Sequence, residues 1–233
     1  MSRRQRRKHE LAVINESDLT DEEVWRGINA VNRQVTEDYS PHWGGRLHLE
    51  LDPRPEGLDY ALRIRNESTL EDAAGHHTIN TTRAQFGRVL GEVALNTGFE
   101  WTVILSHEVL EMLANPSVNK YAIDWHTGLI TPMEICDPVQ ATAYDIDGVL
   151  VSDFVLPTYY ESDIRHRDCA FHTRGVRPFA VPEGGYAIRF NQNWEEVSVF
   201  NHTDVTVGHY RAEQARLMAQ YTANAMRGWG EEE

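Results

Sequence analysis

Residues 99–114 read FEWTVILSHEVLEMLA, the most apolar stretch of the chain, and an Asn-Pro pair follows directly. The apolar residues recur at the spacing of one helical face, so the stretch predicts a largely buried helix. After Glu100 near its start, three charged or titratable side chains stand inside it, those of His107, Glu108 and Glu111. Because burying such groups without partners costs several kcal/mol, they indicate a chemical site on this helix.

His107 and Glu111 are four residues apart, which on a helix places both side chains on one face, one turn apart. Zinc peptidases use this spacing for two histidine ligands, and the glutamate after the first histidine is their general base. A carboxylate such as Glu111 also ligates zinc, although its charge lowers the Lewis acidity of the ion and suits Mn²⁺ or Ca²⁺ as well. The pattern therefore predicts His107 and Glu111 as metal ligands and Glu108 as the base. The alternative is a buried cluster of salt bridges with arginines.

Two carboxylates downstream, Glu134 and Asp137 in the segment MEICDP, are the best candidates for a third ligand. They stand three residues apart, so on a helical turn or a tight loop they share a side. Cys136 lies between them at a spacing that does not suit a ligand set, which favours a buried structural thiol. A disulfide with Cys169 is the alternative.

The chain before this helix predicts strands and one amphipathic helix. The segment TDEE at 20–23 matches a capping box, and the apolar face that follows continues to about residue 39. Residues 66–85 are polar and predict a loop in which His76 and His77 are solvated. Apolar or alternating patterns predict strands over residues 11–15, 46–52 and 60–65. The mixed pattern of residues 86–95 favours a strand, with a short helix as the alternative.

The chain after this helix predicts loops, short strands and a final helix. Asp147-Gly148 predicts the turn of a hairpin over residues 144–149, because this dipeptide suits the two-residue turns that join antiparallel strands. Residues 186–190 alternate like a strand, and the composition of residues 205–227 predicts a helix.

The charge of the chain is strongly acidic and uneven. It has 22 basic and 36 acidic residues and a formal net charge of -14, and five of the basic residues stand within the first eight positions. We expect a disordered basic arm over residues 1–9, a single domain over 10–228 and an acidic tail over 229–233. A body this acidic repels phosphate backbones, which argues against general nucleic-acid binding.

The short apolar runs and the low cysteine content argue against a membrane-spanning protein, a secreted protein and a disulfide-rich scaffold. No apolar run reaches the roughly 18 residues of a membrane span, and no apolar segment follows the basic arm as in a secretory signal. The two cysteines are too few for a disulfide scaffold. We therefore expect no contact with a membrane.

Several other polar residues are weaker candidates for a site. Asp153 lies within an apolar strand and is interpreted as a structural hydrogen-bond acceptor rather than a site residue. Tyr159 and Tyr160 are interpreted as packing residues, with stabilisation of an oxyanion as the alternative. His166 and His172 stand in an arginine-rich loop and are interpreted as surface residues rather than ligands.

Three segments resemble the zincin metallopeptidases and, more narrowly, a group of uncharacterised zincin-like proteins from bacteria and their phages. They are SHEVLEM at 106–112, EICDP at 134–138 and VSDFV at 151–155, and the resemblance covers most of residues 11–200. It implies an α+β, zincin-like fold in which a twisted mixed sheet packs on the active-site helix, with a C-terminal helix. It also implies a metal-activated water that attacks a peptide carbonyl.

Within that resemblance, the gluzincin branch takes its third ligand from a glutamate on a later segment. Glu134 matches that ligand and Asp137 matches an aspartate that orients His107, while the opposite assignment of the two stays open. Glu111 departs from the family by replacing a histidine, which bears on proteolytic competence. The residues after Glu111 lack the further histidine and glycine of the metzincins, which argues against that branch.

These observations lead to the hypothesis of a metal-dependent hydrolase, a zinc peptidase acting on a peptide or protein. Zn²⁺ is the expected cofactor, with Mn²⁺ or Ca²⁺ as alternatives. The rival hypothesis is a non-catalytic zincin-fold protein for binding or assembly, such as a phage structural component, in which the ion or the charge cluster serves stability. We expect a cytoplasmic protein, or a virion-associated one if it comes from a phage. The residues assigned to the metal site are His107, Glu111, Glu134 and Asp137, with Glu108 as the general base.

Overall fold

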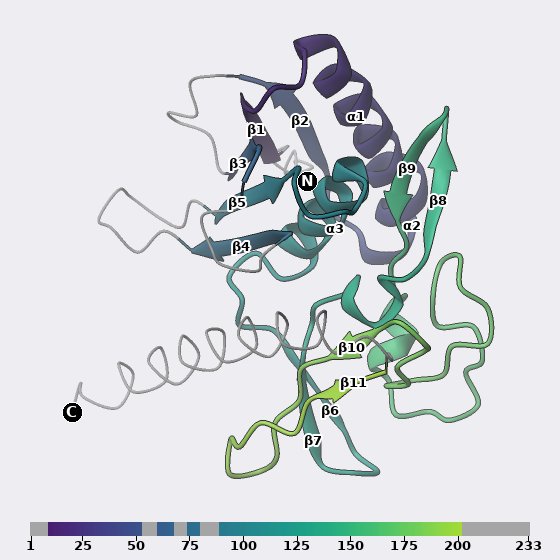
Figure 1. Cartoon of the computed structure of the whole chain (residues 1–233). Coiled ribbons are helices and arrows are strands. Elements are labelled where there is room, and N and C mark those ends of the chain that lie inside the picture. Colours follow the sequence, from purple (N-terminus) through teal and green to yellow (C-terminus); the bar gives the residue numbers. More distant parts are fainter. Residues whose placement is uncertain (1–8, 53–59, 68–73, 80–88, 202–233) are drawn as a thin grey trace, which may run out of the picture. The chain divides into compact units, whose positions relative to one another are not determined.

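The computed structural model describes residues 9–52, 60–67, 74–79 and 89–201 (Figure 1). The chain divides into two compact units, and each is described by itself. The first unit contains the described residues up to 113 and the segment 145–151. The second unit contains residues 114–144 and 152–201. A single domain over 10–228 stays a prediction. The predicted arm, acidic tail and final helix lie outside the described residues, except that the first strand begins at His9.

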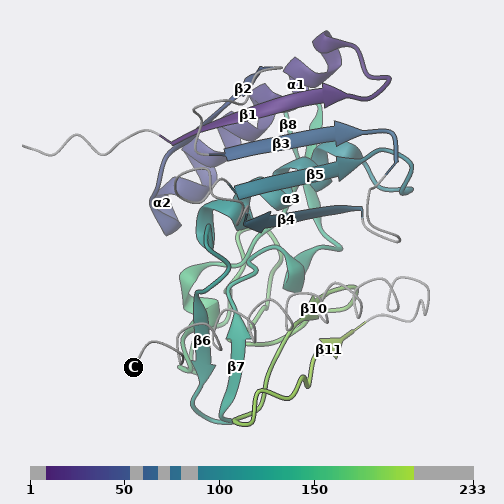
Figure 2. The ribbon, with the colours of Figure 1, turned by 90° about the vertical axis from the view of Figure 1, so that its left-hand side faces the viewer.

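A five-stranded mixed sheet forms the centre of the first unit (Figure 2). Its strand order is β2-β1-β3-β5-β4; the first four of these run parallel, and β4 at the edge runs antiparallel to β5. The mixture of sheet and helices agrees with the predicted α+β class. The strands predicted over 11–15, 46–52 and 60–65 are confirmed, and so is the described part of the strand predicted over 86–95. The strands are β1 (His9–Glu16), β2 (Leu47–Leu51), β3 (Tyr60–Arg65), β4 (Gly75–Ile79) and β5 (Val89–Ala94).

The first helical segment begins at the predicted capping box. Thr20 Oγ1 accepts a hydrogen bond from the backbone N–H of Glu23, and the Glu23 carboxylate accepts one from the backbone N–H of Thr20. The predicted apolar face is buried in full, because Val24, Ile28, Val31 and Val35 are almost inaccessible to solvent. The segment comprises α1 (Asp21–Arg33), the π-helical η1 (Gln34–Tyr39) and the short α2 (Ser40–Trp43).

The helix predicted over 99–114 is α3 (Trp101–Ala114). Helices α1 and α3 lie on the same face of the sheet (Figures 1 and 2). They approach closely at Gly27, where an added Cβ would stand 2.4 Å from a ring carbon of Trp101. Against the sheet, Met112 of α3 packs beside Gly91 of β5. The motif-bearing helix is therefore held by the sheet on one side and by α1 on another.

Strand β4 was not predicted, and the expectation of a loop over residues 66–85 is wrong for residues 75–79. The segment GHHTI lacks the apolar alternation that marks a half-buried strand. The reason is a tertiary contact, because His77 faces a carboxylate of α3 rather than an apolar core. A strand whose inward side chain is polar has no hydrophobic signature to detect.

The described part of the second unit contains short hairpins and 3-10 turns. Its hydrophobic cluster joins Tyr186, Ile188 and Phe190 to the flanking Ile130 and Phe200. Of the strand predicted over 186–190, only the first two residues pair regularly with another strand. Phe190 forms isolated β-bridges with Ile130 and Glu196. The elements are β6 (Tyr121–Asp124), β7 (Leu129–Pro132), η2 (Asp137–Val139), η3 (Pro157–Tyr160), β10 (Tyr186–Ala187) and β11 (Val199–Phe200).

The predicted hairpin is formed by β8 (Ala143–Ile146) and β9 (Val149–Ser152). Its turn lies at the predicted dipeptide, and Asp147 and Gly148 both adopt positive φ angles, 53° and 79°. Two successive positive φ values are the requirement of the type I′ turn, which aspartate and glycine tolerate best. Among the helices that the structure describes, none is long and apolar enough to cross a membrane.

Candidate metal centre

The structure brings His107 and Glu111 together on α3 as predicted. His107 Nε2 lies 3.3 Å from Glu111 Oε2, and the two side chains are 17% and 5% exposed. The four-residue spacing accounts for the contact, since it is close to one full turn of the helix. The pair combines an imidazole nitrogen and a carboxylate oxygen, both of which are ligands for Zn²⁺.

Glu108 lies on the neighbouring face of the same helix and is held by the edge strand. Its Oε2 is 3.0 Å from Nδ1 of His77 on β4, and the two side chains are only 5% and 4% exposed. Its Oε1 lies against Gly75, where an added Cβ would come within 2.8 Å of that oxygen. Both the histidine and the glycine thus shape the space that the Glu108 carboxylate occupies.

His77 is a site residue that the sequence did not reveal. It was interpreted as solvated, and that interpretation is wrong because its side chain is almost fully buried beside Glu108. The ligand atoms of His77, Glu108 and Glu111 all lie within 4.8 Å of one another. The only signal in the sequence was the histidine itself, 31 positions before Glu108, with no pattern linking the two.

Each carboxylate of this part of α3 has a histidine partner, Glu108 with His77 and Glu111 with His107. Two buried carboxylates beside two imidazoles form a mixed nitrogen and oxygen donor set. The side chains are therefore of the kind that could hold a metal ion, and the choice between a metal site and a cluster of salt bridges stays a prediction. Imidazole suits zinc and other transition metals, while carboxylates suit Mn²⁺, Mg²⁺ and Ca²⁺.

Glu134 and Asp137 belong to the second unit, where both side chains are buried. The Glu134 carboxylate lies 3.5 Å from the side-chain amide of Asn115, and its backbone carbonyl accepts a hydrogen bond from the Tyr160 hydroxyl. Asp137 opens the 3-10 turn η2. Their assignment as the third ligand and its orienting partner stays a prediction.

The two cysteines are both free and buried, so the disulfide alternative is wrong and the interpretation of Cys136 as a buried thiol is confirmed. Burial raises the pKa of the Cys169 thiol, an effect that a hydrogen bond with Thr158 partly offsets. The thiolate is the reactive form of cysteine, so a raised pKa makes Cys169 a poor nucleophile.

Asp153 is a structural acceptor, as predicted. Its side chain is fully buried. Oδ1 accepts hydrogen bonds from the backbone N–H groups of Phe154 and His172, and Oδ2 accepts two from Thr173, one from the backbone and one from the hydroxyl. These four hydrogen bonds satisfy the buried carboxylate, so no bound ligand is needed to explain its burial.

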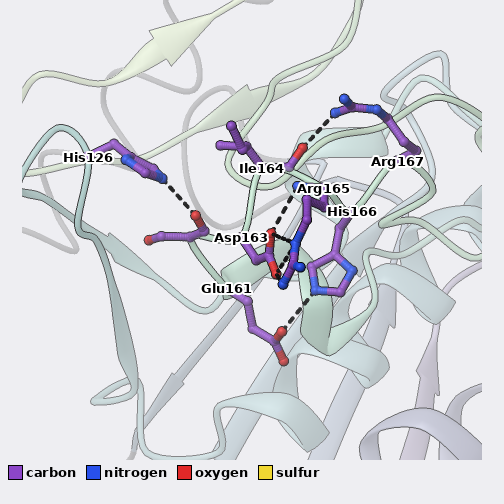
Figure 3. Close-up of polar contacts among 8 residues, drawn as sticks. His126, Glu161, Asp163, Ile164, Arg165, His166 and Arg167 are labelled. Carbon is purple, nitrogen blue, oxygen red and sulfur yellow. Dashed lines mark hydrogen bonds and ion pairs between the residues drawn. The ribbon is translucent and has the colours of Figure 1, made fainter.

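The remaining candidates are packing and surface residues, as predicted. Tyr159 is buried and packs edge-on against Tyr160, with ring centroids 5.1 Å apart. Burial raises the pKa of Tyr159, which keeps its hydroxyl protonated. His172 is exposed and stacks on Tyr144. His166 lies on a surface loop and pairs with Glu161 at 3.1 Å (Figure 3).

The loop around His166 is held by its own side chains (Figure 3). Arg165 Nε donates to both oxygens of Asp163, at 2.9 and 3.0 Å. These hydrogen bonds hold the pKa of Asp163 well below its usual range. The loop therefore has an internal ion pair as its organising contact, which supports the interpretation of His166 as a surface residue.

No family model matches this chain, and no curated protein or solved structure matches it either. What the site can do therefore has to be inferred from its residues.

Proposed function

We propose that this protein is a metal-dependent hydrolase of the zincin type, with a peptide or protein as substrate. The observation that carries the proposal is the placement of His107 and Glu111 on adjacent turns of α3, with their ligand atoms 3.3 Å apart and Glu108 buried beside them. Two ligands one helical turn apart, with a carboxylate after the first, are the core of the zinc-peptidase motif.

The arrangement of the first unit supports the zincin resemblance. That resemblance implies a twisted mixed sheet packed on the motif-bearing helix, and α3 packs on a mixed sheet through contacts with Gly75 and Gly91. The mixed order, with an antiparallel strand at one edge, places β4 beside the motif. The sheet therefore supplies the rigid support that a catalytic helix requires.

The donor set fits a divalent cation. His107 Nε2 and Glu111 Oε2 would hold Zn²⁺, Mn²⁺ or Ca²⁺. A third ligand from Glu134 or Asp137 stays a prediction from the sequence. Such an ion supplies Lewis-acid chemistry, because it polarises a carbonyl oxygen and makes a nearby water more acidic. The negative charge of Glu111 makes this effect weaker than two histidines would.

Glu108 is the general base in this proposal. Its carboxylate takes the proton of the attacking water and passes it to the leaving amine as the peptide bond breaks. His77 keeps one of its oxygens in place through the 3.0 Å contact. A base fixed in this way loses little entropy when the substrate binds, which favours reaction.

The first test is metal analysis of the purified chain. We expect bound Zn²⁺ or Mn²⁺, and we expect His107→Ala to lose about one equivalent. The matched control is His48→Ala, since His48 also pairs with a glutamate on its own strand but its side chain is 38% exposed. A chain that binds no divalent ion, and whose melting temperature does not respond to one, would contradict the metal site.

The second test is hydrolysis of a peptide library by the Glu108→Gln variant. Removing a general base lowers kcat by roughly 10² to 10⁴-fold, while the ion that depends on His107 stays bound. Glu50→Gln, an exposed glutamate on β2, is the control and should keep full activity. Full activity in Glu108→Gln would contradict this mechanism. A wild-type chain that binds the ion but cleaves nothing would favour the non-catalytic alternative.

A further inference from the structure

The residues His77, Glu108 and Glu111 form a group that we call the inner cluster. His77 comes from the edge strand β4, and the two glutamates come from adjacent turns of α3. One ligand atom of each lies within 4.8 Å of the others, and all three side chains are 5% exposed or less. The cluster shares Glu111 with the pair that was predicted from the sequence motif.

The spacing of these donors fits a single cation. Ligand distances of about 2.0 to 2.6 Å allow two donors of one ion to stand up to roughly 5 Å apart. One imidazole nitrogen and two carboxylate oxygens suit Mn²⁺ or Zn²⁺, which accept both kinds of ligand. Because the donors come from a strand and a helix that pack together, the ion would join the sheet edge to α3.

The charge of the inner cluster points in the same direction. It places two carboxylates in a region almost closed to solvent, where removing each charge from water costs several kcal/mol. A divalent cation balances both carboxylates at once. The side chains lose their hydrating water on burial, and bonds to the cation would take the place of those contacts with water.

The backbone at Gly75 leaves room for this arrangement. A Cβ added there would come within 2.8 Å of Glu108 Oε1 and 2.5 Å of a methyl carbon of Ile104. Only a glycine lets the strand pass this close to the carboxylate. Gly75 and His77, two residues apart on β4, thus both border the Glu108 side chain.

We propose that the inner cluster binds a second divalent cation, with His77 as its nitrogen ligand and Glu111 shared with the ion at His107. Two ions that lie close together are a known arrangement in hydrolases, where they act on the attacking and leaving atoms together. The proposal goes beyond the proposed function, which needs one ion only. When both ions are bound, Glu108 is a ligand of the second ion. When only the ion at His107 is bound, Glu108 is the general base.

The test counts the ions that the full chain binds. The protein is treated with a chelator and titrated with Mn²⁺ in about 0.15 M NaCl, which screens the acidic surface. Free Mn²⁺ is measured from its paramagnetic resonance signal. We expect two bound ions in the wild type, one in His77→Ala, one in His107→Ala and two in the control His48→Ala.

The variants separate this inference from the proposed function. His77→Ala should weaken one ion by at least about 100-fold and leave the other unchanged. If it binds two ions with wild-type affinity, the inner cluster is not a metal site, whatever His107→Ala does. If His107→Ala keeps both ions while His77→Ala loses one, the inner cluster stands and the proposed ion at His107 fails. A wild type that binds no ion contradicts both.

A glycine pair keeps the test decisive if His77→Ala does not fold. Gly75→Ala retains all three donors and adds a methyl group against Glu108, so it should weaken the inner ion by about 10-fold or more. Gly91→Ala is the matched control, because its Cβ meets only Leu62 and Met112 among its nearest atoms. Mn²⁺ binding by Gly75→Ala equal to that of the wild type would overturn the proposal.

Discussion

At the scale of single residues, the buried acids Asp153, Glu108 and Glu111 differ in their surroundings. Asp153 is surrounded by donors of its own chain and accepts four hydrogen bonds. Glu108 and Glu111 are instead placed beside imidazole nitrogens. The difference decides their roles, because a carboxylate with four protein donors has no capacity left for an ion, while a carboxylate beside other ligands can share one.

Asp153→Asn should therefore destabilise the protein although it conserves volume. An asparagine places an N–H group where an oxygen now accepts bonds from Phe154 and His172 or from Thr173, so buried donors would face one another. We expect a loss of about 2 to 3 kcal/mol in the free energy of unfolding, measured with urea. Asp145→Asn, at an exposed position of the hairpin, should stay within about 0.5 kcal/mol. Equal effects of the two would show that the four bonds do not matter.

The capping box of α1 gives a pH dependence at the same scale. Hydrogen bonds from the backbone and the hydroxyl of Thr20 lower the pKa of Glu23 below its ordinary value of 4.5. A carboxylate whose pKa is lower in the folded state stabilises that state above its unfolded pKa, and the contribution is lost as the pH falls through the folded pKa.

We therefore expect Glu23→Gln to lower the urea midpoint at pH 7, and the difference from the wild type to shrink as the pH falls below about 4.5. The measurement is a series of urea melts between about pH 3 and pH 7. Glu22→Gln removes a charge from the same helical turn without touching the capping box, so its effect at pH 7 should be smaller. A Glu23→Gln difference that does not vary with pH would contradict the linkage.

At the scale of elements, the contact between α1 and α3 depends on the absence of a side chain at Gly27. The nearest atoms to an added Cβ belong to Trp101 and Thr102, at 2.4 to 3.2 Å. Any side chain at this position would push the two helices apart. Since α3 carries the candidate ligands, this helix contact also helps to set the position of the site.

Gly27→Ala should destabilise the chain by about 1 to 3 kcal/mol, because overpacking outweighs the gain of up to about 1 kcal/mol in helix propensity. The free energy of unfolding in urea measures this loss. Asn29→Ala on the exposed side of α1 is the control and should be neutral or slightly stabilising. A stabilised Gly27→Ala variant would mean that the helices can separate at no cost.

The elements also show what a sequence pattern can and cannot predict. The capping box, the apolar face of α1 and the Asp147-Gly148 turn were predictable because each depends on neighbours within a few residues. Strand β4 was not, because its stability comes from pairing with β5 and from the contact of His77 with α3. The same reason separates the site residues. His107 and Glu111 follow from helical spacing, whereas His77 joins them only through the sheet.

At the scale of the whole molecule, the net charge of -14 has consequences for binding. Like charges repel one another in the folded state, so cations stabilise an acidic protein in general. A specific site differs from this general effect in two respects. It saturates at a fixed number of ions, and it resists added monovalent salt because buried groups are screened much less than surface groups.

Divalent cations should accordingly raise the melting temperature of the chelator-treated protein. An ion present at 100 times its Kd adds about 2.7 kcal/mol to the stability of the folded state. For a chain of this size each kcal/mol corresponds to about 2 to 4 °C, so we expect a rise of roughly 5 to 10 °C with Mn²⁺ or Zn²⁺. NaCl at equal ionic strength should give a much smaller shift, because it reaches only the surface charges. The double variant His77→Ala/His107→Ala should respond to Mn²⁺ no more than to NaCl, and a response equal to that of the wild type would place the ions on the acidic surface instead.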